Sequence, residues 1–304
     1  SDLERLVKSA LGHRPEAYYG LLLMDGDSMG GWVGGDPRFP VTYGDSWHSE
    51  VVQATERRFA GNDAVLRYLR SPRAVSPARH AAISTALNAF SGEVARWVVE
   101  ELFLGKLLYT GGDDVMAMVP VEDLLPCLFL LRCAYSGIVP AGERESISRG
   151  RAEVKEHLQR VARGHVLRPG KEERLLRMMG GRATASAGAV VAHHTAPLQA
   201  VLRTLREAER RAKGHGRNAF SVSLRKRSGG TTELTASWGF GGVPCGSGDS
   251  PRDDAYVPEE WRQASEGLRT PMGVLLELRD TLALEGVSRR AAYGCLEWLP
   301  QLPA

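Results

Sequence analysis

The stretch from Leu107 to Pro120 constrains the fold more than any other part of this sequence. Two apolar, strand-like runs flank a Gly111-Gly112-Asp113-Asp114 centre. Paired glycines allow positive φ without a Cβ clash, as a tight hairpin turn requires. We therefore expect a β-hairpin with two carboxylates at its tip. These carboxylates could be a solvated acidic turn, or one half of a metal site, because hard divalent cations prefer carboxylate oxygens.

A second acidic pair follows a buried-looking strand near the start of the sequence. Tyr18–Met24 is largely apolar and leads into Asp25-Gly26-Asp27. Side chains two apart on a strand share a face, so Asp25 and Asp27 could point the same way. Asp-Gly-Asp alone also suits any polar turn after a strand. Together with the hairpin, it supplies the converging carboxylates that two-metal phosphoryl chemistry needs.

Hydrophobic spacing predicts the elements that connect these acids. We expect helices over Pro77–Leu102, Leu124–Tyr135 and Pro197–Lys213, and strands over Ala183–His193 and Asn218–Leu224. Ser76 is a candidate N-cap for the first helix. The resulting order is β-α-β-β-α-β, a ferredoxin-like topology in which the first strand and the hairpin are central neighbours. This order predicts that the two acidic pairs meet.

In combination, these motifs resemble the catalytic palm of the large subunit of type III CRISPR effector complexes, type III-B in particular. The resemblance covers roughly residues 15–228. It rests on Asp25–Gly30, Arg79–Leu87, Tyr109–Val115, Ser186–His194 and Ala212–Asn218. The last of these is similar to the Ala-Lys-x-x-Gly-Arg-Asn segment of diguanylate cyclases. The conjunction of ordered motifs is specific, whereas any one of them alone is not.

The resemblance implies an α+β fold, with a ferredoxin-like palm of the nucleotide-cyclase and diguanylate-cyclase type followed by a small C-terminal α-helical domain. We assign residues 1–230 to the palm, with a helical insertion at about 141–182. Residues 231–257, rich in Gly, Ser and Pro, are expected to be a linker, and 258–304 the helical domain. The family's large subunit usually begins with a histidine-aspartate nuclease domain and an inactive palm. No His-Asp dipeptide occurs here, so we expect part of such a subunit or a naturally reduced version.

The resemblance also implies a reaction and its partners. ATP would be joined through 3′-5′ linkages into cyclic oligoadenylates, with pyrophosphate released, when a guide-RNA complex binds target RNA. The other effector subunits, the guide RNA and the target RNA would be partners. Two alternatives stay open. One is a cyclic dinucleotide synthase, against which Gly-Gly-Asp-Asp in place of Gly-Gly-Asp/Glu-Glu-Phe argues. The other is a non-catalytic scaffold or RNA-binding palm subunit, against which the intact acidic pairs argue.

Five residues are candidates for holding two Mg²⁺ or Mn²⁺ ions. We expect Asp25 and Asp113 to bind the metals, with Asp27 and Asp114 completing the shell or assisting deprotonation. The Gly26 carbonyl could also reach a metal. Asp25, Asp113 and Asp114 are the candidate catalytic residues. Adjacent strand residues face opposite sides, so Asp113 and Asp114 are equivalent only if the turn directs both inward.

A further set of residues is expected to hold the ATP phosphates. The nucleotide-binding candidates are Gly26, Asp27, Ser28, Met29, Gly30, Lys213 and Arg217. Backbone N–H groups of the loop after the first strand suit phosphate oxygens. Lys213 and Arg217, four apart at a helix end, would meet the phosphates from the other side. The helix dipole also favours cations at this place without any ligand.

Composition adds few constraints. The 304 residues carry a formal charge of only +3, and the four cysteines form no Cys-x-x-Cys pair, which argues against a zinc ribbon or a secreted disulfide framework. No apolar run approaches the length of a membrane span and no signal peptide is recognised, so we expect a cytoplasmic location. The arginine-rich stretch 141–182 could bind RNA or a neighbouring subunit, or be a solvated helical insertion.

Overall fold

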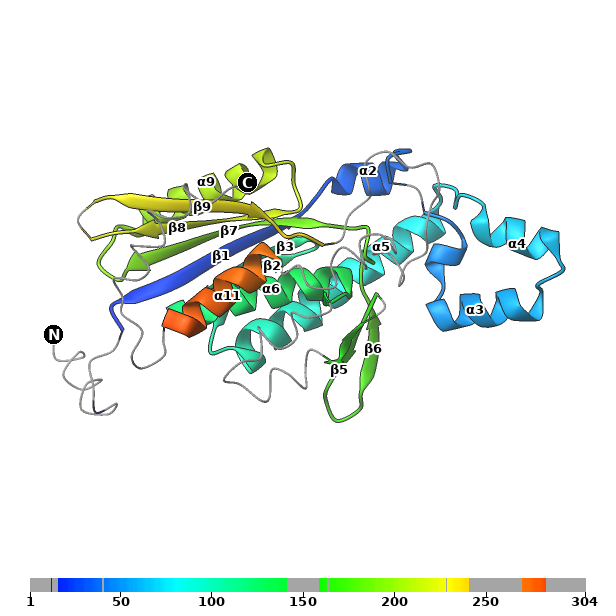
Figure 1. Cartoon of the computed structure of the whole chain (residues 1–304), viewed down its shortest axis with the longest axis horizontal. Helices are drawn as coiled ribbons and strands as arrows, with labels where there is room; N and C mark the ends of the chain where they lie inside the picture. The colour runs from blue at the N-terminus through cyan, green and yellow to red at the C-terminus, as the bar shows by residue number, and fades with distance from the viewer. Residues whose placement is uncertain are drawn as a thin grey trace.

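A six-stranded sheet with helices on both faces organises the described part of the chain (Figure 1). The computed structural model describes residue 12 and residues 16–39, 41–140, 159–162, 164–227, 229–240 and 270–282. The strand order is β2-β3-β1-β7-β8-β9. The strands are β1 (Tyr18–Gly26), β2 (Lys106–Gly111), β3 (Asp114–Val119), β7 (Ala185–His193), β8 (Ala219–Arg225) and β9 (Thr231–Ser237).

The predicted ferredoxin-like palm is confirmed. Strand β1 runs antiparallel to both β3 and β7, which is the arrangement of a β-α-β-β-α-β unit formed by β1, β2, β3 and β7. Strand β8 extends the sheet parallel to β7, and β9 pairs antiparallel with β8. The end of β1 therefore lies between the start of β3 and the start of β7.

The helices α6 and α9 cover opposite faces of the sheet, and the described part of the chain has seven labelled α-helices. They are α2 (Met29–Gly34), α3 (Ser49–Arg58), α4 (Asp63–Arg70), α5 (Pro77–Ala89), α6 (Val121–Ser136), α9 (Leu198–Gly214) and α11 (Pro271–Leu282). The short helix η1 spans Gly44–Ser46, and the π-helical turns η2 (Phe90–Val94) and η3 (Trp97–Leu102) continue α5. The predicted cap of α5 is confirmed, because the Arg79 amide donates to Ser76 Oγ at 3.3 Å.

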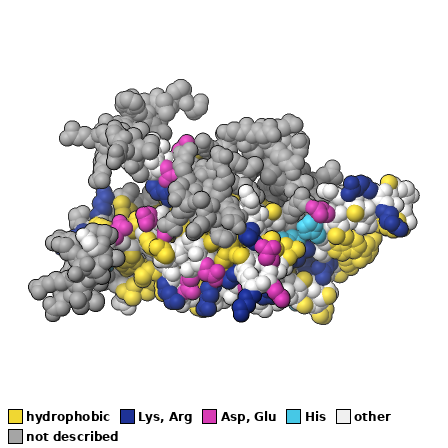
Figure 2. Space-filling model, turned by 90° about the horizontal axis from the view of Figure 1, so that it is seen from below, with side chains coloured by type: hydrophobic (Ala, Val, Ile, Leu, Met, Phe, Trp, Pro, Cys, Tyr) yellow, Lys and Arg dark blue, Asp and Glu magenta, His cyan; other side chains and the backbone are white. Residues whose placement is uncertain are grey.

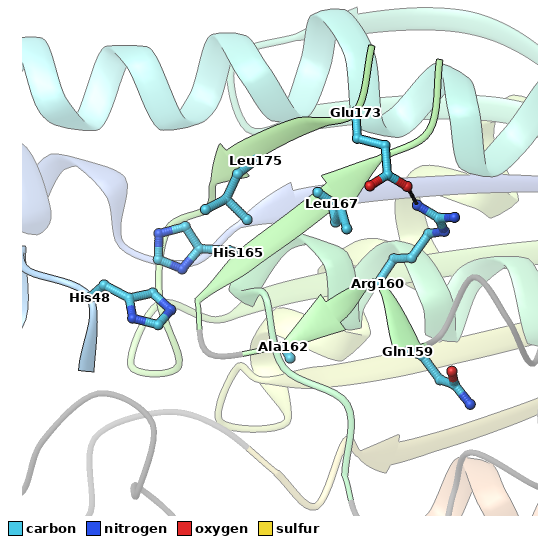
Figure 3. Close-up of a pocket in the computed structure, with 8 residues that line it drawn as sticks. All are labelled: His48, Gln159, Arg160, Ala162, His165, Leu167, Glu173 and Leu175. Atoms are coloured by element: carbon cyan, nitrogen blue, oxygen red, sulfur yellow. Dashed lines mark hydrogen bonds and ion pairs between the residues drawn. The ribbon is translucent and has the colours of Figure 1, made fainter. Parts of the chain in front are cut away.

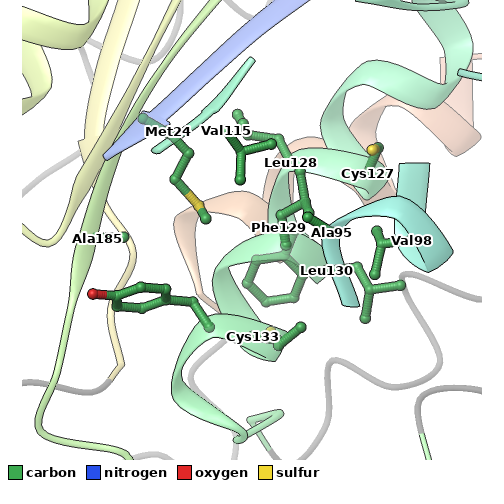
Figure 4. Close-up of a cluster of buried hydrophobic side chains, with 14 of the residues drawn as sticks. Met24, Ala95, Val98, Val115, Cys127, Leu128, Phe129, Leu130, Cys133 and Ala185 are labelled. Atoms are coloured by element: carbon green, nitrogen blue, oxygen red, sulfur yellow. The ribbon is translucent and has the colours of Figure 1, made fainter. Parts of the chain in front are cut away.

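Each face of the sheet has its own apolar core. On one face, Met24 and Val115 pack with Leu128 and Phe129 of α6 (Figure 4). Cys127 and Cys133, also on α6, are buried in the same cluster, as core residues rather than ligands. On the other face, α9 packs on the sheet through a smaller cluster of Leu21, Val190, Ala192, Val201 and Leu205. Alternate residues of β1 therefore face α6 and α9 in turn.

Two predicted boundaries are wrong. Residues 231–237, expected to be linker, form β9. This strand lies at the sheet edge and is mostly exposed, so it needs no apolar alternation and its sequence gives little strand signal. Within the stretch 141–182, expected to be helical, residues 161–177 instead contain a three-stranded sheet of β4 (Val161–Ala162), β5 (His165–Arg168) and β6 (Arg174–Arg177). Residues 141–158 and most of 258–304 lie outside the described residues.

Aromatic residues after β1 anchor the following segment to the body. Trp32 is buried and its ring lies 5.1 Å from that of Phe39, and Tyr43 stacks on Tyr68 of α4 at 4.6 Å. Helices α3 and α4 then project from the sheet (Figure 1). No helix among the described residues is long and apolar enough to cross a membrane.

Candidate functional site

Asp25 lies at the end of β1 on the face that α9 covers. Leu21 packs against α9, and alternation along the strand turns Asp25 to the same side. The Lys213 ammonium, in the last turn of α9, forms an ion pair with Asp25 Oδ2. The same ammonium pairs with Glu209 Oε1 at 2.6 Å, one helical turn earlier. Asp25 is therefore held in an ion-paired cluster that joins the sheet to the helix.

The hairpin brings both of its acids to Asp25. Gly111 pairs with Asp114 across the turn, and Gly112 has a φ of +63°, so the paired glycines serve the tight turn that the sequence predicts. Asp114 is the first residue of β3, and a hydrogen bond joins its carboxyl group to that of Asp25. Asp113 occupies the turn itself, beside Gly26. The predicted convergence of the two acidic segments is thus present for three of the four carboxyl groups.

Gly26 makes room for this arrangement. A Cβ placed on Gly26 would lie 2.8 Å from Asp113 Oδ2 and would also collide with the Tyr135 hydroxyl. The backbone N–H of Gly26 instead donates to the Asp113 carboxylate. Tyr135, buried in α6, donates its hydroxyl hydrogen to Met29 Sδ at 3.3 Å. The glycine therefore allows the hairpin tip to approach the end of β1.

The carboxyl groups hold protons more tightly than isolated acids do. Burial, with the hydrogen bond and charge of Asp25 and the charge of Asp113, raises the pKa of Asp114 to about 7. Burial and the charge of Asp25 also raise the pKa of Asp113. Burial lowers the pKa of Lys213, but its hydrogen bonds to Asp25 and Glu209 outweigh this, so its net shift is upward. Negative charge is thus concentrated here beyond what one ammonium group neutralises.

Asp27 has a different environment from Asp25. Its carboxylate is 4% exposed. It accepts hydrogen bonds from Ser186 Oγ at 2.7 Å, Thr184 Oγ1 at 2.8 Å and the backbone N–H of Asn218 at 2.9 Å. These contacts tie the end of β1 to the starts of β7 and β8. With three donors on its two oxygens, Asp27 has a structural role in this conformation, and its predicted place among the metal ligands stays a prediction.

The predicted phosphate loop adopts a defined turn. Ser28 takes up the left-handed conformation with a φ of 58°. Its carbonyl accepts from the Gly31 amide at 2.8 Å, which starts α2 directly after Asp27. Met29 and Gly30 form the first turn of that helix. This loop adjoins the acidic cluster, and its role in binding phosphates stays a prediction.

Arg217 is not drawn into the cluster. It lies in the turn after α9 with a φ of 64°, and its amide donates to the Lys213 carbonyl at 3.2 Å. Its side chain is exposed, and within the described residues it contacts none of the acids. Of the two predicted phosphate-binding cations, Lys213 lies in the site and Arg217 at its rim.

The oxygen atoms of the cluster suit a metal ion that is shared with a bound substrate. Within the described residues, no group of three or more His, Cys, Asp or Glu side chains is arranged to hold a metal ion by itself. Asp25 is occupied by Lys213, and Asp27 by its three donors. Mg²⁺, however, is usually held by one or two carboxylates together with substrate phosphates. The hydrogen-bonded Asp25 and Asp114, with Asp113 beside them, fit that kind of shared site but not a cage made only of protein ligands.

Sequence reasoning missed several residues that build the site. They are Arg132, Tyr135, Thr184, Ser186 and Glu209. Glu209 precedes Lys213 by four residues, a spacing at which ion pairs form on helices, so a signal existed. Thr184 and Ser186 are polar residues in and beside an apolar strand, a weaker signal. Arg132 is fully buried, donates to Asn218 Oδ1 at 2.8 Å, and thereby supports the Asp27 network. Nothing in the apolar sequence of α6 indicates this role.

A cavity elsewhere contains none of these residues. It has a volume of about 440 Å³ and lies between the start of α3 and the small three-stranded sheet (Figure 3). The rings of His48 and His165 lie 5.2 Å apart there, while Arg160 and Glu173 form an ion pair at 2.6 Å. Among the described residues, the acidic cluster brings charged groups from distant segments together beside the Ser28–Gly30 loop, and its catalytic role stays a prediction.

A comparison with protein-family models shows which family the sheet and its helices resemble. Residues 18–167 match the family model described as Cas10/Cmr2, second palm domain. The chain carries a Cas10/Cmr2 second palm. This segment contains β1, the α5 helix and the acidic hairpin, so the Asp25, Asp113 and Asp114 cluster belongs to the palm.

Two curated relatives and one solved structure extend this finding. The palm-containing chain is 29% identical over 229 residues to the CRISPR system Cmr subunit Cmr2 of Pyrococcus furiosus, covering 74% of this chain and 20% of that protein. It is 39% identical over 69 residues to the CRISPR system CMR subunit Cmr2 of Saccharolobus solfataricus, covering 21% and 6% respectively. A type III-B Cmr-beta structure bound to cognate target RNA shares the fold, with a TM-score of 0.53, 15% identity and coverage of 98% of this chain and 34% of that one.

The chain spans about a fifth of the Pyrococcus furiosus protein and less of the Saccharolobus solfataricus one. The comparison thus identifies the Cas10/Cmr2 palm and supports its membership of a large subunit. Activity, substrate and partners of the complete subunit are taken up as proposals.

Proposed function

We propose that this palm catalyses metal-dependent nucleotidyl transfer, joining ATP into cyclic oligoadenylates as part of a cytoplasmic, RNA-guided type III-B effector complex. The observation that carries the proposal is the meeting of Asp25, Asp113 and Asp114 at the ends of two adjacent strands. A palm serving only as scaffold has no need of three carboxyl groups held together, two of which, Asp113 and Asp114, have pKa values raised by burial and by the charge of Asp25. Adenine selectivity and cyclisation rest on the family resemblance.

The residues have distinct roles in this proposal. Asp25 and Asp114, with Asp113, would hold Mg²⁺ or Mn²⁺ jointly with the triphosphate. Bound metal ions would neutralise the phosphates and lower the pKa of the attacking 3′-hydroxyl. The backbone of Ser28–Gly30 would orient the β- and γ-phosphates, and these would attract the Lys213 ammonium away from Asp25. In the transfer, the 3′-oxygen bonds to the α-phosphorus, the bond to the β-phosphate oxygen breaks, and pyrophosphate leaves.

Catalysis would also require that the backbone around Asp25 is held rigidly. The end of β1 is fixed to β7 and β8 by the hydrogen bonds that Asp27 accepts from Thr184, Ser186 and the backbone N–H of Asn218. Arg132 of α6 donates a hydrogen bond to the Asn218 side chain. Positioning within about 0.5 Å is needed for reactive geometry, and these buried and partly buried hydrogen bonds would hold Asp25 and the Ser28–Gly30 loop in place.

An activity assay tests the proposal. The effector complex containing this chain is given guide RNA, target RNA, Mn²⁺ and radiolabelled ATP or GTP, and the products are sized by chromatography. Cyclic oligoadenylate from the wild type, lost by at least about a hundredfold in Asp113→Ala/Asp114→Ala, supports the proposal. Asp36→Ala is the matched control, because among the described residues Asp36 forms its ion pair with the neighbouring Arg38. A cyclic diguanylate product would indicate the dinucleotide synthase, and no product with target RNA would leave a scaffold role.

A further inference from the structure

The outer face of α9 carries a row of arginines. Arg203, Arg206 and Arg210 follow a three- and four-residue spacing that places them on one side of the helix. All three are exposed. The opposite side is buried against the sheet through Val201, Leu205, Ala208 and Ala212. The row therefore points away from the sheet and is available to a partner.

These arginines have no acidic partner within the described residues. Cations on the flanks of α9 are neutralised: Arg211 pairs with Glu233 at 3.0 Å and Lys213 with Asp25 and Glu209. Glu207 is the only acidic side chain exposed along α9, and it forms no ion pair with the row. Helix-dipole stabilisation does not explain the row, because it favours cations in the last turn, and Arg203 and Arg206 lie well before that turn.

More cations continue the row at both ends. At the start of α9, Arg225 Nη1 donates to the Ala200 carbonyl at 3.1 Å, which places the exposed Lys226 and Arg227 near that end. At the other end, exposed Arg217 follows the helix next to the candidate site. The helix has 17 residues, a length of about 25 Å at 1.5 Å per residue. The positive charge thus extends along the whole helix to the rim of the acidic cluster.

We propose that this outer face of α9 binds the phosphodiester backbone of a single-stranded RNA segment. Guanidinium groups bind phosphates in bidentate geometry. The exposed residues of the face are mainly charged, with Leu198 at the helix start as its one large exposed hydrophobic side chain, whereas protein interfaces need buried apolar or aromatic anchors. Lack of an aromatic platform predicts contacts to phosphates and little base preference. The choice of RNA as the polyanion rests on the proposed function, since an RNA-guided complex supplies it.

A second basic surface provides a matched comparison. Helices α3 and α4 carry exposed Arg57, Arg58 and Arg67 among exposed hydrophobic side chains such as Phe59 and Tyr68. Basic and hydrophobic side chains gather at the right-hand end of the molecule in Figure 2. These arginines lie in the last turns of their helices, where the dipole accounts for them. The apolar surroundings suit a protein partner rather than RNA.

RNA binding is measured by fluorescence anisotropy with the full chain and a labelled single-stranded RNA of about 12 nucleotides. Each phosphate contact contributes about 0.7 to the slope of log affinity against log salt. Arg203→Ala/Arg206→Ala/Arg210→Ala should lower the slope by about 2 and the affinity at 0.1 M salt by about a hundredfold. The corresponding triple lysine variant, which keeps the charge, should bind within about tenfold of the wild type, even if the alanine variant is unstable.

Two controls separate this proposal from its alternatives. Arg57→Ala/Arg58→Ala/Arg67→Ala removes the same charge elsewhere and should leave RNA binding unchanged. Asp113→Ala/Asp114→Ala should also bind RNA normally, so that failure of catalysis and failure of RNA binding are distinguishable. Wild-type affinity in the α9 alanine variant, an equal loss in the α3–α4 variant, or stronger binding of an acidic peptide than of RNA would each overturn the proposal.

Discussion

A hydrogen bond joins the carboxyl groups of Asp114 and Asp25 across two neighbouring strands. These residues are 89 positions apart in sequence, and only the β1–β3 pairing brings them together. The contact requires one shared proton, since two unprotonated carboxylates in this position would repel each other. This protonation makes the site dependent on pH and on bound cations, and the first prediction follows from it.

The first prediction concerns stability and pH without divalent ions. The folded-state pKa of Asp114, about 7, lies above its ordinary value of 3.8. The folded state therefore binds the proton more tightly, and this contribution to stability is present at low pH and is lost as pH rises through about 7. After discounting for solvent screening, we expect the loss to be about 2 kcal/mol. Asp114→Asn should remove it, as measured by urea denaturation at pH 5 and pH 8.

The control for this experiment is Asp36→Asn. A hydrogen bond from Arg38 lowers the pKa of Asp36 to about 2, so Asp36 stays charged at both pH values. Its substitution should leave the difference in unfolding free energy between pH 5 and pH 8 unchanged. An identical difference in wild type and Asp114→Asn would show that Asp114 does not carry the shared proton.

The second prediction separates Asp27 from Asp25. Asp27→Ala leaves one buried and two partly buried donors without their acceptor, so we expect a loss of about 3 kcal/mol in unfolding free energy. Asp25→Ala relieves repulsion and should cost much less. The loss in Asp27→Ala should be the same with and without Mn²⁺. If Asp27→Ala is as stable as wild type but binds Mn²⁺ more weakly, Asp27 is a metal ligand instead.

The third prediction concerns the close approach at Gly26. Gly26→Ala places a methyl group 2.8 Å from Asp113 Oδ2, so we expect a stability loss of about 1–3 kcal/mol and displacement of the hairpin tip. Gly92→Ala is the control, because a Cβ there meets nothing within 4 Å and the helical position should gain up to about 1 kcal/mol. Thermal denaturation measures both. Equal melting temperatures for Gly26→Ala and wild type would contradict the described packing.

The fourth prediction is that removing the Lys213 ammonium changes the affinities for Mn²⁺ and for ATP in opposite directions. Lys213→Met removes the ammonium that occupies Asp25, so Mn²⁺ alone should bind several times more tightly. Loss of the phosphate partner should weaken ATP binding by about tenfold. Free Mn²⁺ is counted by electron paramagnetic resonance, and ATP by calorimetry. Lys106→Met, which removes an ion pair with Glu100 at 2.8 Å, should change neither. If the affinities for Mn²⁺ and ATP changed in the same direction, this would contradict a competition between Lys213 and Mn²⁺ for Asp25.

The local sequence predicts the parts of this molecule whose signals are local. The hairpin depends on Gly-Gly, the start of α5 on Ser76 and Pro77, and α9 on its apolar spacing, and all three are present. Strand β9 could not be predicted, because an exposed edge strand shows no hydrophobic alternation. The Asp27 network was also missed, since its donors come from residues 184, 186 and 218, and only the folded sheet brings these together.

The partners of Asp25 and Asp27 could likewise not be predicted from the sequence. The predicted strand order correctly places Asp25 beside the hairpin acids. It does not reveal that Asp27, two residues later, is saturated by donors, or that Lys213 already pairs with Asp25. Such pairing depends on where α9 ends relative to β1, a tertiary relationship that neither propensity nor periodicity contains.

Anomalous diffraction from crystals soaked with Mn²⁺ and a non-hydrolysable ATP analogue tests the central claim most directly. The account predicts a manganese peak within about 2.1 Å of Asp25 and Asp113 or Asp114 oxygens, bridged to the triphosphate, with Lys213 moved from Asp25 to a phosphate. A nucleotide bound elsewhere, with Asp25 still paired to Lys213 and no manganese at the hairpin, would contradict it.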